Sequence, residues 1–153
     1  MKALIIDDEK RTRELIAKMI ESFDLGIETF PIGESVETGI KAIDQVRPDL
    51  VFLDIQMPDG TGFDLLKMIP QKNFEVIFIT AHEEFAIKAI KFSALDYILK
   101  PVDTDDLKEA VLRAINTIDH KKEESQFEAL NQNMQPTQKR RLVLKTQESV
   151  HVV

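Results

Sequence analysis

The sequence predicts an α/β protein, a doubly wound (βα)5 sandwich around a five-stranded parallel sheet. Two patterns lead to this prediction. Short apolar runs rich in β-forming residues recur along residues 1–99, and segments with apolar residues at helical spacing follow them. Most of the runs are continuously apolar and do not alternate with polar residues, as expected of parallel strands with helices on both faces of their sheet.

The elements follow from these two patterns. Five strands are predicted at Ala3–Ile6, Ile27–Phe30, Leu50–Leu53, Val76–Ile79 and Tyr97–Leu99. Five helices are predicted where apolar residues recur three or four positions apart. Their apolar residues are Leu15, Ile16, Met19, Ile20 and Phe23; Val36, Ile40 and Ile43; Phe63, Leu66 and Ile69; Ala86, Ile87 and Ile90; and Leu107, Val111, Ile115 and Ile118.

Helix ends have their own signals. Pro48 follows the second predicted helix, and Pro70 ends the third. Thr104 is expected to cap the fifth helix, because Asp105 and Asp106 behind it place negative charge at the helix N-terminus.

Length and composition suit one domain with a tail. The chain has 153 residues, of which 43% are hydrophobic, and domains usually run to about 100 to 150 residues. The net charge of the whole chain is −7. Residues 120–153 carry six Lys/Arg and four Asp/Glu, a net charge of +2, so residues 1–119 have a net charge of −9. Such an acidic body argues against direct nucleic-acid binding by that part. The lack of Cys, of a signal peptide and of a membrane-length apolar run predicts a cytoplasmic protein.

Polar residues follow the predicted strands where the strands end. They are Asp7, Asp8 and Glu9 after the first, Asp54 after the third, Thr80 after the fourth, and Lys100 with Pro101 after the fifth. In a doubly wound sheet these positions share one edge. Three converging carboxylates need a cation, and hard oxygen ligands suit Mg²⁺. A carboxylate, a metal, a Lys and a hydroxyl are what phosphoryl transfer needs, with Asp54 as the natural acceptor.

These residues resemble the receiver domains of two-component response regulators, which have a flavodoxin-like fold. The resemblance covers residues 1 to about 119 and rests on DDE at 7–9, DIQMPDGTGFDLL at 54–66, TA at 80–81 and DYILKP at 96–101. It implies that Asp54 is the phosphoacceptor and that Mg²⁺ is held by Asp8, by Asp7 (often through water), by Asp54 and by the Gln56 backbone carbonyl. It also implies that Thr80 and Lys100 bind the phosphoryl group, that Thr80 and Tyr97 form the switch, and that Pro101 is a cis-proline candidate.

The stretch FAIKAIKFSALDYILKPVD resembles the subgroup of receivers joined to LytTR-type DNA-binding domains. Residues 1–119 are then the receiver domain and residues 120–138 a helix extension or linker. Residues 139–153 are the first residues of a truncated LytTR-type domain, because LVLKTQESVHVV resembles its opening hairpin.

The resemblance implies partners as well. A sensor histidine kinase would supply the phosphoryl group, and DNA would be contacted only through the missing effector domain. By family analogy, the fourth helix, fifth strand and fifth helix form a candidate homodimer contact, with Phe85, Lys88, Lys91 and Asp105 among its residues. Nothing in the sequence targets a membrane.

Simpler readings stand beside these. A lone Asp-Asp pair is usually a solvated loop or a helix cap, and it is the joint spacing with Asp54, Thr80 and Lys100 that favours a site. The residue pattern at 59–62 predicts a turn and not a phosphate-binding loop. His82 is predicted to be an exposed loop residue and not a metal ligand, since Mg²⁺ prefers oxygen ligands.

Two other functions compete with that of a switch. One is a Mg²⁺-dependent phosphohydrolase with an aspartyl-phosphate intermediate, which usually needs a second acid two residues after the nucleophile, where this chain has Gln56. The other is a pseudo-receiver that is never phosphorylated, against which the intact acids, Thr80 and Lys100 argue. We therefore expect a phosphoacceptor that assists its own phosphotransfer and dephosphorylation, and not an enzyme that turns over a separate substrate.

Overall fold

The structure, a computed structural model, describes residues 1–132. The first half of the fold contains β1 (Lys2–Ile6), α1 (Lys10–Ser22), β2 (Glu28–Gly33), α2 (Val36–Val46), β3 (Leu50–Leu53), β4 (Gln56–Met57), β5 (Gly60–Thr61) and α3 (Gly62–Lys67). The second half contains β6 (Glu75–Thr80), the 3-10 helix η1 (Glu83–Phe85), α4 (Ala86–Lys91), β7 (Asp96–Leu99) and α5 (Thr104–Gln132). Within residues 1–132, no helix combines the length and the apolar character that crossing a bilayer requires.

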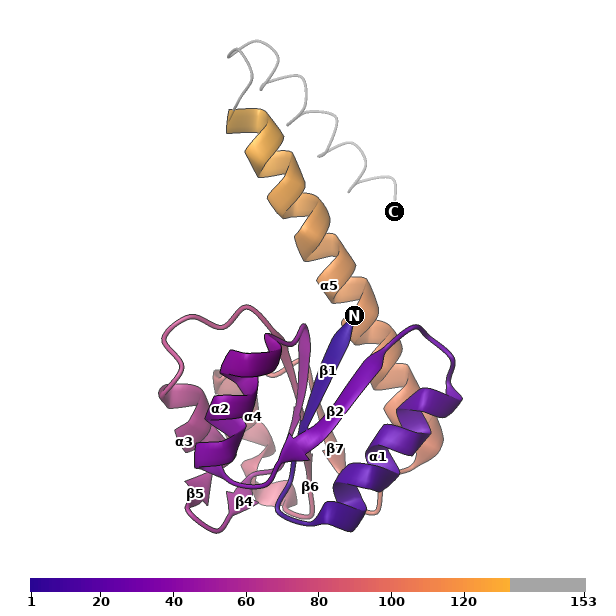
Figure 1. Ribbon diagram of the computed structural model, residues 1–153, viewed down its shortest axis with the longest axis vertical. Coiled ribbons are helices and arrows are strands. Elements are labelled where there is room, and N and C mark those ends of the chain that lie inside the picture. Colours follow the sequence, from indigo (N-terminus) through magenta and orange to yellow (C-terminus); the bar gives the residue numbers. More distant parts are fainter. Residues whose placement is uncertain (133–153) are drawn as a thin grey trace. The chain divides into compact units, whose positions relative to one another are not determined.

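The main sheet has five strands in the order β2-β1-β3-β6-β7, and every neighbouring pair is parallel. Figure 1 shows α2, α3 and α4 on one face of this sheet and α1 with the first part of α5 on the other. This confirms the predicted fold class. The short hairpin of β4 and β5 was not predicted as strands. Its turn is at residues 58–59, so the turn expected at residues 59–62 is only partly correct, because residues 60–61 form β5 and Gly62 begins α3.

The core lies on both faces of the three central strands. All four residues of β3 are buried, and Phe52, Phe63 and Phe78 are among the largest fully buried side chains. A run of four apolar residues with no polar break must be covered from both sides, which is why the central strand was predicted with the bounds that the structure shows.

Several sequence expectations need correction. Leu15, Ile87 and Ile90 lie on the predicted apolar faces of their helices, but they are 52%, 73% and 74% exposed. The α5 cap is Asp103 and not Thr104, because the Asp103 carboxylate accepts a hydrogen bond from the Asp106 amide at 3.2 Å. Thr104 is the first helical residue, so the expectation for this cap was wrong by one position.

The chain divides into two compact units, residues 1–115 and residues 116–153. The first contains the sheet and the helices that cover it. Of the second, residues 116–132 are described and form the later part of α5. The segment expected to begin a LytTR-type domain, residues 139–153, lies outside the described residues.

Candidate functional site

Strand register brings the polar residues together at the carboxyl edge of the sheet. Ile6 pairs with Leu53 at the ends of β1 and β3, so Asp7 and Asp54 leave the sheet side by side. The Asp54 amide continues this ladder by donating a hydrogen bond to the Ile6 carbonyl at 3.0 Å. In the same way, the Lys100 amide donates to the Thr80 carbonyl at 2.9 Å beyond the last pair of β6 and β7.

Lys100 joins the two buried carboxylates. Its Nζ lies 2.8 Å from Asp7 Oδ2 and 2.9 Å from Asp54 Oδ2. Burial alone would lower the pKa of the Lys100 ammonium, but its hydrogen bonds to Asp7 and Asp54 and their negative charges outweigh that effect and raise the pKa. Lys100 therefore stays charged beside both acids.

Asp7 is the most deeply buried of the acids, with 1% of its surface exposed. Its Oδ1 accepts a hydrogen bond from the Glu9 amide at 2.9 Å, and its own amide donates to the Gly33 carbonyl at 2.9 Å. Burial raises the pKa of its carboxyl, although the hydrogen bond from Lys100 opposes that shift. The ionised form of Asp7 is thus held at a cost that a further cation would reduce.

Asp54 is buried and its two oxygens face different partners. Oδ1 accepts from the Ile55 amide at 2.6 Å, while Oδ2 faces Lys100. Behind it, the Gly62 amide donates to the Ile55 carbonyl at 2.7 Å. A Cβ at Gly62 would lie 2.5 Å from the Asp54 carbonyl oxygen, so this close approach of α3 to the site requires glycine.

The three predicted acids can reach one cation. One carboxylate oxygen from each of Asp7, Asp8 and Asp54 lies within 4.8 Å of the others, and Asp8 is exposed at the mouth of the cluster. Carboxylate oxygens with open access for water are the ligands that Mg²⁺ prefers. The donor set and the raised pKa of Asp7 both fit a divalent, oxygen-seeking metal.

The other predicted site residues lie around this cluster. Thr80 is fully buried, and its hydroxyl accepts from the His82 amide at 3.4 Å. The Tyr97 hydroxyl donates to the His82 carbonyl, so both residues hold the loop between β6 and η1. Gln56 lies in β4 with an exposed side chain, and the Lys100–Pro101 peptide bond is cis. The His82 ring pairs with Glu84 at 3.2 Å and not with the acid cluster.

Two structural supports of the site were missed from the sequence. Asp59 accepts hydrogen bonds from the amides of Val36 and Glu37, which ties the β4–β5 hairpin to the N-terminus of α2. Arg13 donates to the Asp7 carbonyl at 2.7 Å. Its sequence signal is position, since Arg13 shares the buried face of α1 with Ile16, Ala17 and Ile20.

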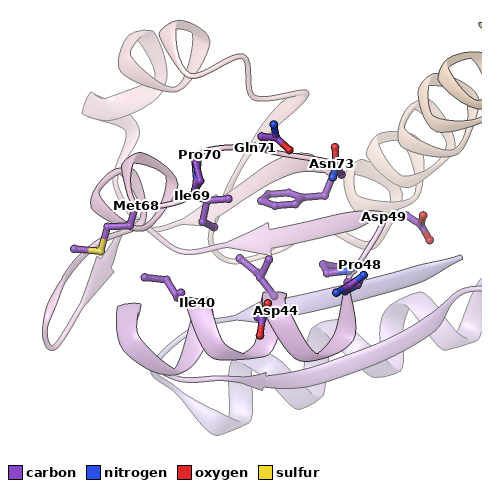
Figure 2. Close-up of a pocket in the computed structure, with 12 residues that line it drawn as sticks. Ile40, Asp44, Pro48, Asp49, Met68, Ile69, Pro70, Gln71 and Asn73 are labelled. Carbon is purple, nitrogen blue, oxygen red and sulfur yellow. The ribbon is translucent and has the colours of Figure 1, made fainter. Parts of the chain in front are cut away.

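A separate pocket lies at the opposite edge of the sheet (Figure 2). It has a volume of about 430 Å³ between α2 and the segment that joins α3 to β6. Ile40, Ile43, Ile69 and Phe74 provide its apolar lining. It contains none of the residues of the acid cluster, so this pocket and the chemically reactive groups are at different ends of the fold.

Comparison with known proteins agrees with this geometry. A family model described as the response regulator receiver domain matches residues 3–112. The chain belongs to the response regulator receiver family. Its relatives include an uncharacterized response regulatory protein of Vibrio cholerae serotype O1, which is 42% identical over 80% of this chain and 51% of its own length. The transcriptional regulatory protein BtsR of Escherichia coli K12 is 39% identical over 74% of this chain and 47% of its own length.

A solved receiver structure shares the fold. It is the response regulator TrrA of Thermotoga maritima in complex with Mg²⁺ and BeF, which is 30% identical, has a TM-score of 0.63, and covers 74% of this chain and 97% of its own. The receiver thus spans about half the length of the curated relatives that it matches.

Proposed function

We propose that this receiver accepts a phosphoryl group on Asp54 from a sensor histidine kinase, with Mg²⁺ held by Asp7, Asp8, Asp54 and the Gln56 backbone carbonyl. The observation that carries the proposal is the convergence of Asp54, Asp7 and Lys100 within hydrogen-bond distance at one sheet edge. A cluster of three acids beside a fixed ammonium has the parts that aspartyl phosphorylation requires.

The transfer balances with these residues. A carboxylate oxygen of Asp54 forms a bond to phosphorus while the bond between phosphorus and the kinase imidazole nitrogen breaks, and the electron pair stays on that nitrogen. Lys100 supplies positive charge next to Oδ2. The Thr80 hydroxyl lies one strand away and is proposed to donate to the phosphoryl oxygen. Mg²⁺, when bound, neutralises phosphoryl oxygens.

The output is proposed to pass through the loop after β6. Thr80 and Tyr97 contact the two successive peptide groups of His82: Thr80 accepts from the His82 amide, and Tyr97 donates to the His82 carbonyl. Movement of the Thr80 hydroxyl toward a phosphoryl group would break its contact with this loop and free Tyr97 to take another position. A redistribution between two states of this loop is the kind of change that phosphorylation biases.

The face made by α4, β7 and α5 suits a homodimer. Ile87 and Ile90 are exposed on α4, and Leu99 and Leu112 are exposed on β7 and α5. Lys88 and Lys91 lie on α4, while Asp106 and Glu109 lie on α5. A two-fold axis would place the basic helix of one copy against the acidic helix of the other.

We further propose that the receiver controls a LytTR-type effector domain. Relatives about twice as long are named as transcriptional regulators, which supports an attached output domain. The proposed division is a receiver at residues 1–119, a linker at 120–138 and the start of the effector at 139–153. Contact with DNA would then belong to the effector.

The proposal is tested by incubating the chain with Mg²⁺ and acetyl phosphate and measuring intact mass. We expect a phosphoryl-sized increase that is absent from Asp54→Ala and retained in Asp44→Asn, a matched change of an exposed aspartate on α2. No adduct on the wild-type chain under varied conditions would favour the pseudo-receiver. Continuous release of phosphate from small phosphate esters, with Asp54 required, would favour the phosphohydrolase.

A further inference from the structure

Arg13 is a buried arginine whose guanidinium contacts backbone carbonyls of two different elements. Nη1 donates to the Asp7 carbonyl at 2.7 Å, and Nε donates to the Pro31 carbonyl in β2 at 3.1 Å. The residue is 8% exposed, and it lies on the inner face of α1. A charged side chain in such a place must find acceptors, and here both are main-chain carbonyls, one of which belongs to Asp7 of the acid cluster.

An irregularity in β2 explains why the Pro31 carbonyl is available. Leu4 pairs with Phe30 and Ile6 pairs with Gly33, so Pro31 and Ile32 together oppose the single residue Ile5. A bulge of this kind interrupts the ladder and turns a carbonyl away from its strand partner. Arg13 takes up that carbonyl.

The same bulge shapes the other side of Asp7. Beyond it, the Gly33 carbonyl accepts the Asp7 amide at 2.9 Å. A Cβ on Gly33 would lie 2.7 Å from Cγ1 of Ile6, so the end of β2 is pressed against the end of β1. The amide of Asp7 is therefore held by β2 directly, and its carbonyl is held by β2 through Arg13.

We propose that Arg13 is a positioning residue of the metal site. Arg13 fixes the peptide group between Asp7 and Asp8, so that the carboxylates of both residues face one cation. This inference rests on the proposed function, in which those acids hold Mg²⁺. Groups one shell outside a metal site typically change metal affinity by about 10- to 100-fold when they are removed. The hydrogen bonds of Arg13 to Asp7 and Pro31 are both made to backbone carbonyls and not to a carboxylate, so Arg13 acts on the metal site through the backbone.

The sign of the effect separates positioning from charge. Arg13 carries a positive charge near a site for a positive ion, so losing the charge alone would strengthen Mg²⁺ binding. Losing the two hydrogen bonds would release the Asp7 peptide group and weaken binding. Arg13→Met removes both charge and hydrogen bonds, whereas Arg13→Lys keeps the charge and cannot reproduce the two-carbonyl fork.

The test is titration of Mg²⁺ into the full chain by calorimetry, with amide chemical shifts of Asp8 and Glu9 as a second readout. We expect the Mg²⁺ Kd to rise about tenfold in Arg13→Met and by an intermediate factor in Arg13→Lys. Arg11→Met is the control, because Arg11 lies on the same helix with an exposed side chain, and its Kd should stay within twofold of wild type.

Three results would overturn the inference. One is an unchanged or tighter Kd in Arg13→Met with unshifted Asp8 and Glu9 amides. If Arg13→Met does not fold, the second such result is a folded Arg13→Lys variant with a lower Tm and an unchanged Mg²⁺ Kd. That outcome would show that Arg13 has a purely structural role. Wild-type protein that binds no Mg²⁺, or binds it equally after Asp8→Asn, overturns the proposed metal site itself and with it the role of Arg13.

Discussion

Lys100 Nζ lies 2.9 Å from Oδ2 of Asp54, across 46 positions of sequence. This contact exists because β7 reaches the same sheet edge as β3, with β6 between them. The ammonium is held by two acids, so its charge is already oriented before any phosphoryl group arrives. Groups oriented in advance stabilise developing charge without the cost of reorganising during the reaction.

Replacement of Lys100 by Met is expected to destabilise the metal-free protein by about 1 to 2 kcal/mol at pH 7. Two buried carboxylates lose their cation, and partial solvent access limits the cost. Loss of the ammonium should raise the pKa of Asp7 further, so the difference from wild type should shrink as pH falls and Asp7 takes up a proton. Urea unfolding at pH 7 and pH 4 checks this, and an equal loss at both pH values would contradict it.

Replacement of Asp7 by Asn is expected to stabilise the chain at pH 7 in EDTA. Folding raises the pKa of the Asp7 carboxyl, so the stability of the folded protein falls as pH rises through the unfolded-state and folded-state pKa values of this group. Ionised Asp7 therefore destabilises the folded protein at neutral pH. Mg²⁺ should reverse the order, because wild type gains about 2.7 kcal/mol at a Mg²⁺ concentration of 100 times Kd. Thermal unfolding in EDTA and in Mg²⁺ measures both, and an Asn variant that is less stable in EDTA would refute the first expectation.

Asp59 is expected to make stability depend on acid pH. Hydrogen bonds from the amides of Glu37 and Val36 lower its pKa in the folded state. Its contribution is therefore present above the unfolded-state pKa of about 3.9 and is lost as pH falls through the lower folded-state value. Asp59→Ala should destabilise the chain at pH 7 and much less near pH 2.5 in urea unfolding. Asp44→Ala is the control, because Asp44 is an exposed residue of α2, the helix whose N-terminal amides Asp59 accepts from.

Replacement of Tyr97 by Phe is expected to loosen the loop after β6 without stopping phosphorylation. The change keeps the ring beside Phe78, at 6.2 Å between centroids, and removes the hydroxyl that donates to the His82 carbonyl. One net hydrogen bond is worth about 1 kcal/mol. Amide exchange at Ala81 and His82, the residues of this loop, should become faster by about fivefold, while the acetyl phosphate adduct persists. Unchanged exchange would show that Tyr97 does not restrain this loop.

Dimerisation through the face of α4, β7 and α5 predicts that beryllofluoride with Mg²⁺ doubles the mass measured by light scattering. Ile90→Asp should return the mass to that of a monomer, because it places charge in the exposed apolar part of this face. Leu15→Asp is the matched control, since Leu15 is a similarly exposed apolar residue on α1. If both variants abolish the dimer, the contact involves α1, and an unchanged wild-type monomer removes the dimer proposal for this chain.

Some elements followed from local sequence because local and tertiary preferences agree there. Leu50–Leu53 was predicted with its observed bounds, as four consecutive apolar residues suit only a strand buried on both faces. The strand at Ile27–Phe30 was predicted too short, since β2 continues to Gly33 through Pro31. Proline usually argues against a strand, but an edge strand with a bulge tolerates it.

Helical spacing predicted α4 but not its buried side. The spacing predicts Ala86, Ile87 and Ile90 as its apolar residues, whereas the structure buries Ala89 and exposes both isoleucines. Phe85 and Phe92 flank α4 in the sequence, but the aromatic residue that packs against both, Phe63, comes from α3. A single helix carries no information about which of two apolar faces will meet such a cluster.

The strand-helix pattern and the polar residues after four of the five predicted strands were enough to predict the fold class and the shared edge of Asp7, Asp54, Thr80 and Lys100. Each of these features is local in the sequence: apolar periodicity within a segment, and polar residues at the end of a strand or directly after it. The tertiary structure decided which atoms meet: the Lys100 bridge, the Arg13 fork and the Asp59 link to α2. These contacts depend on strand order, register and one bulge, which are set when distant segments pack together.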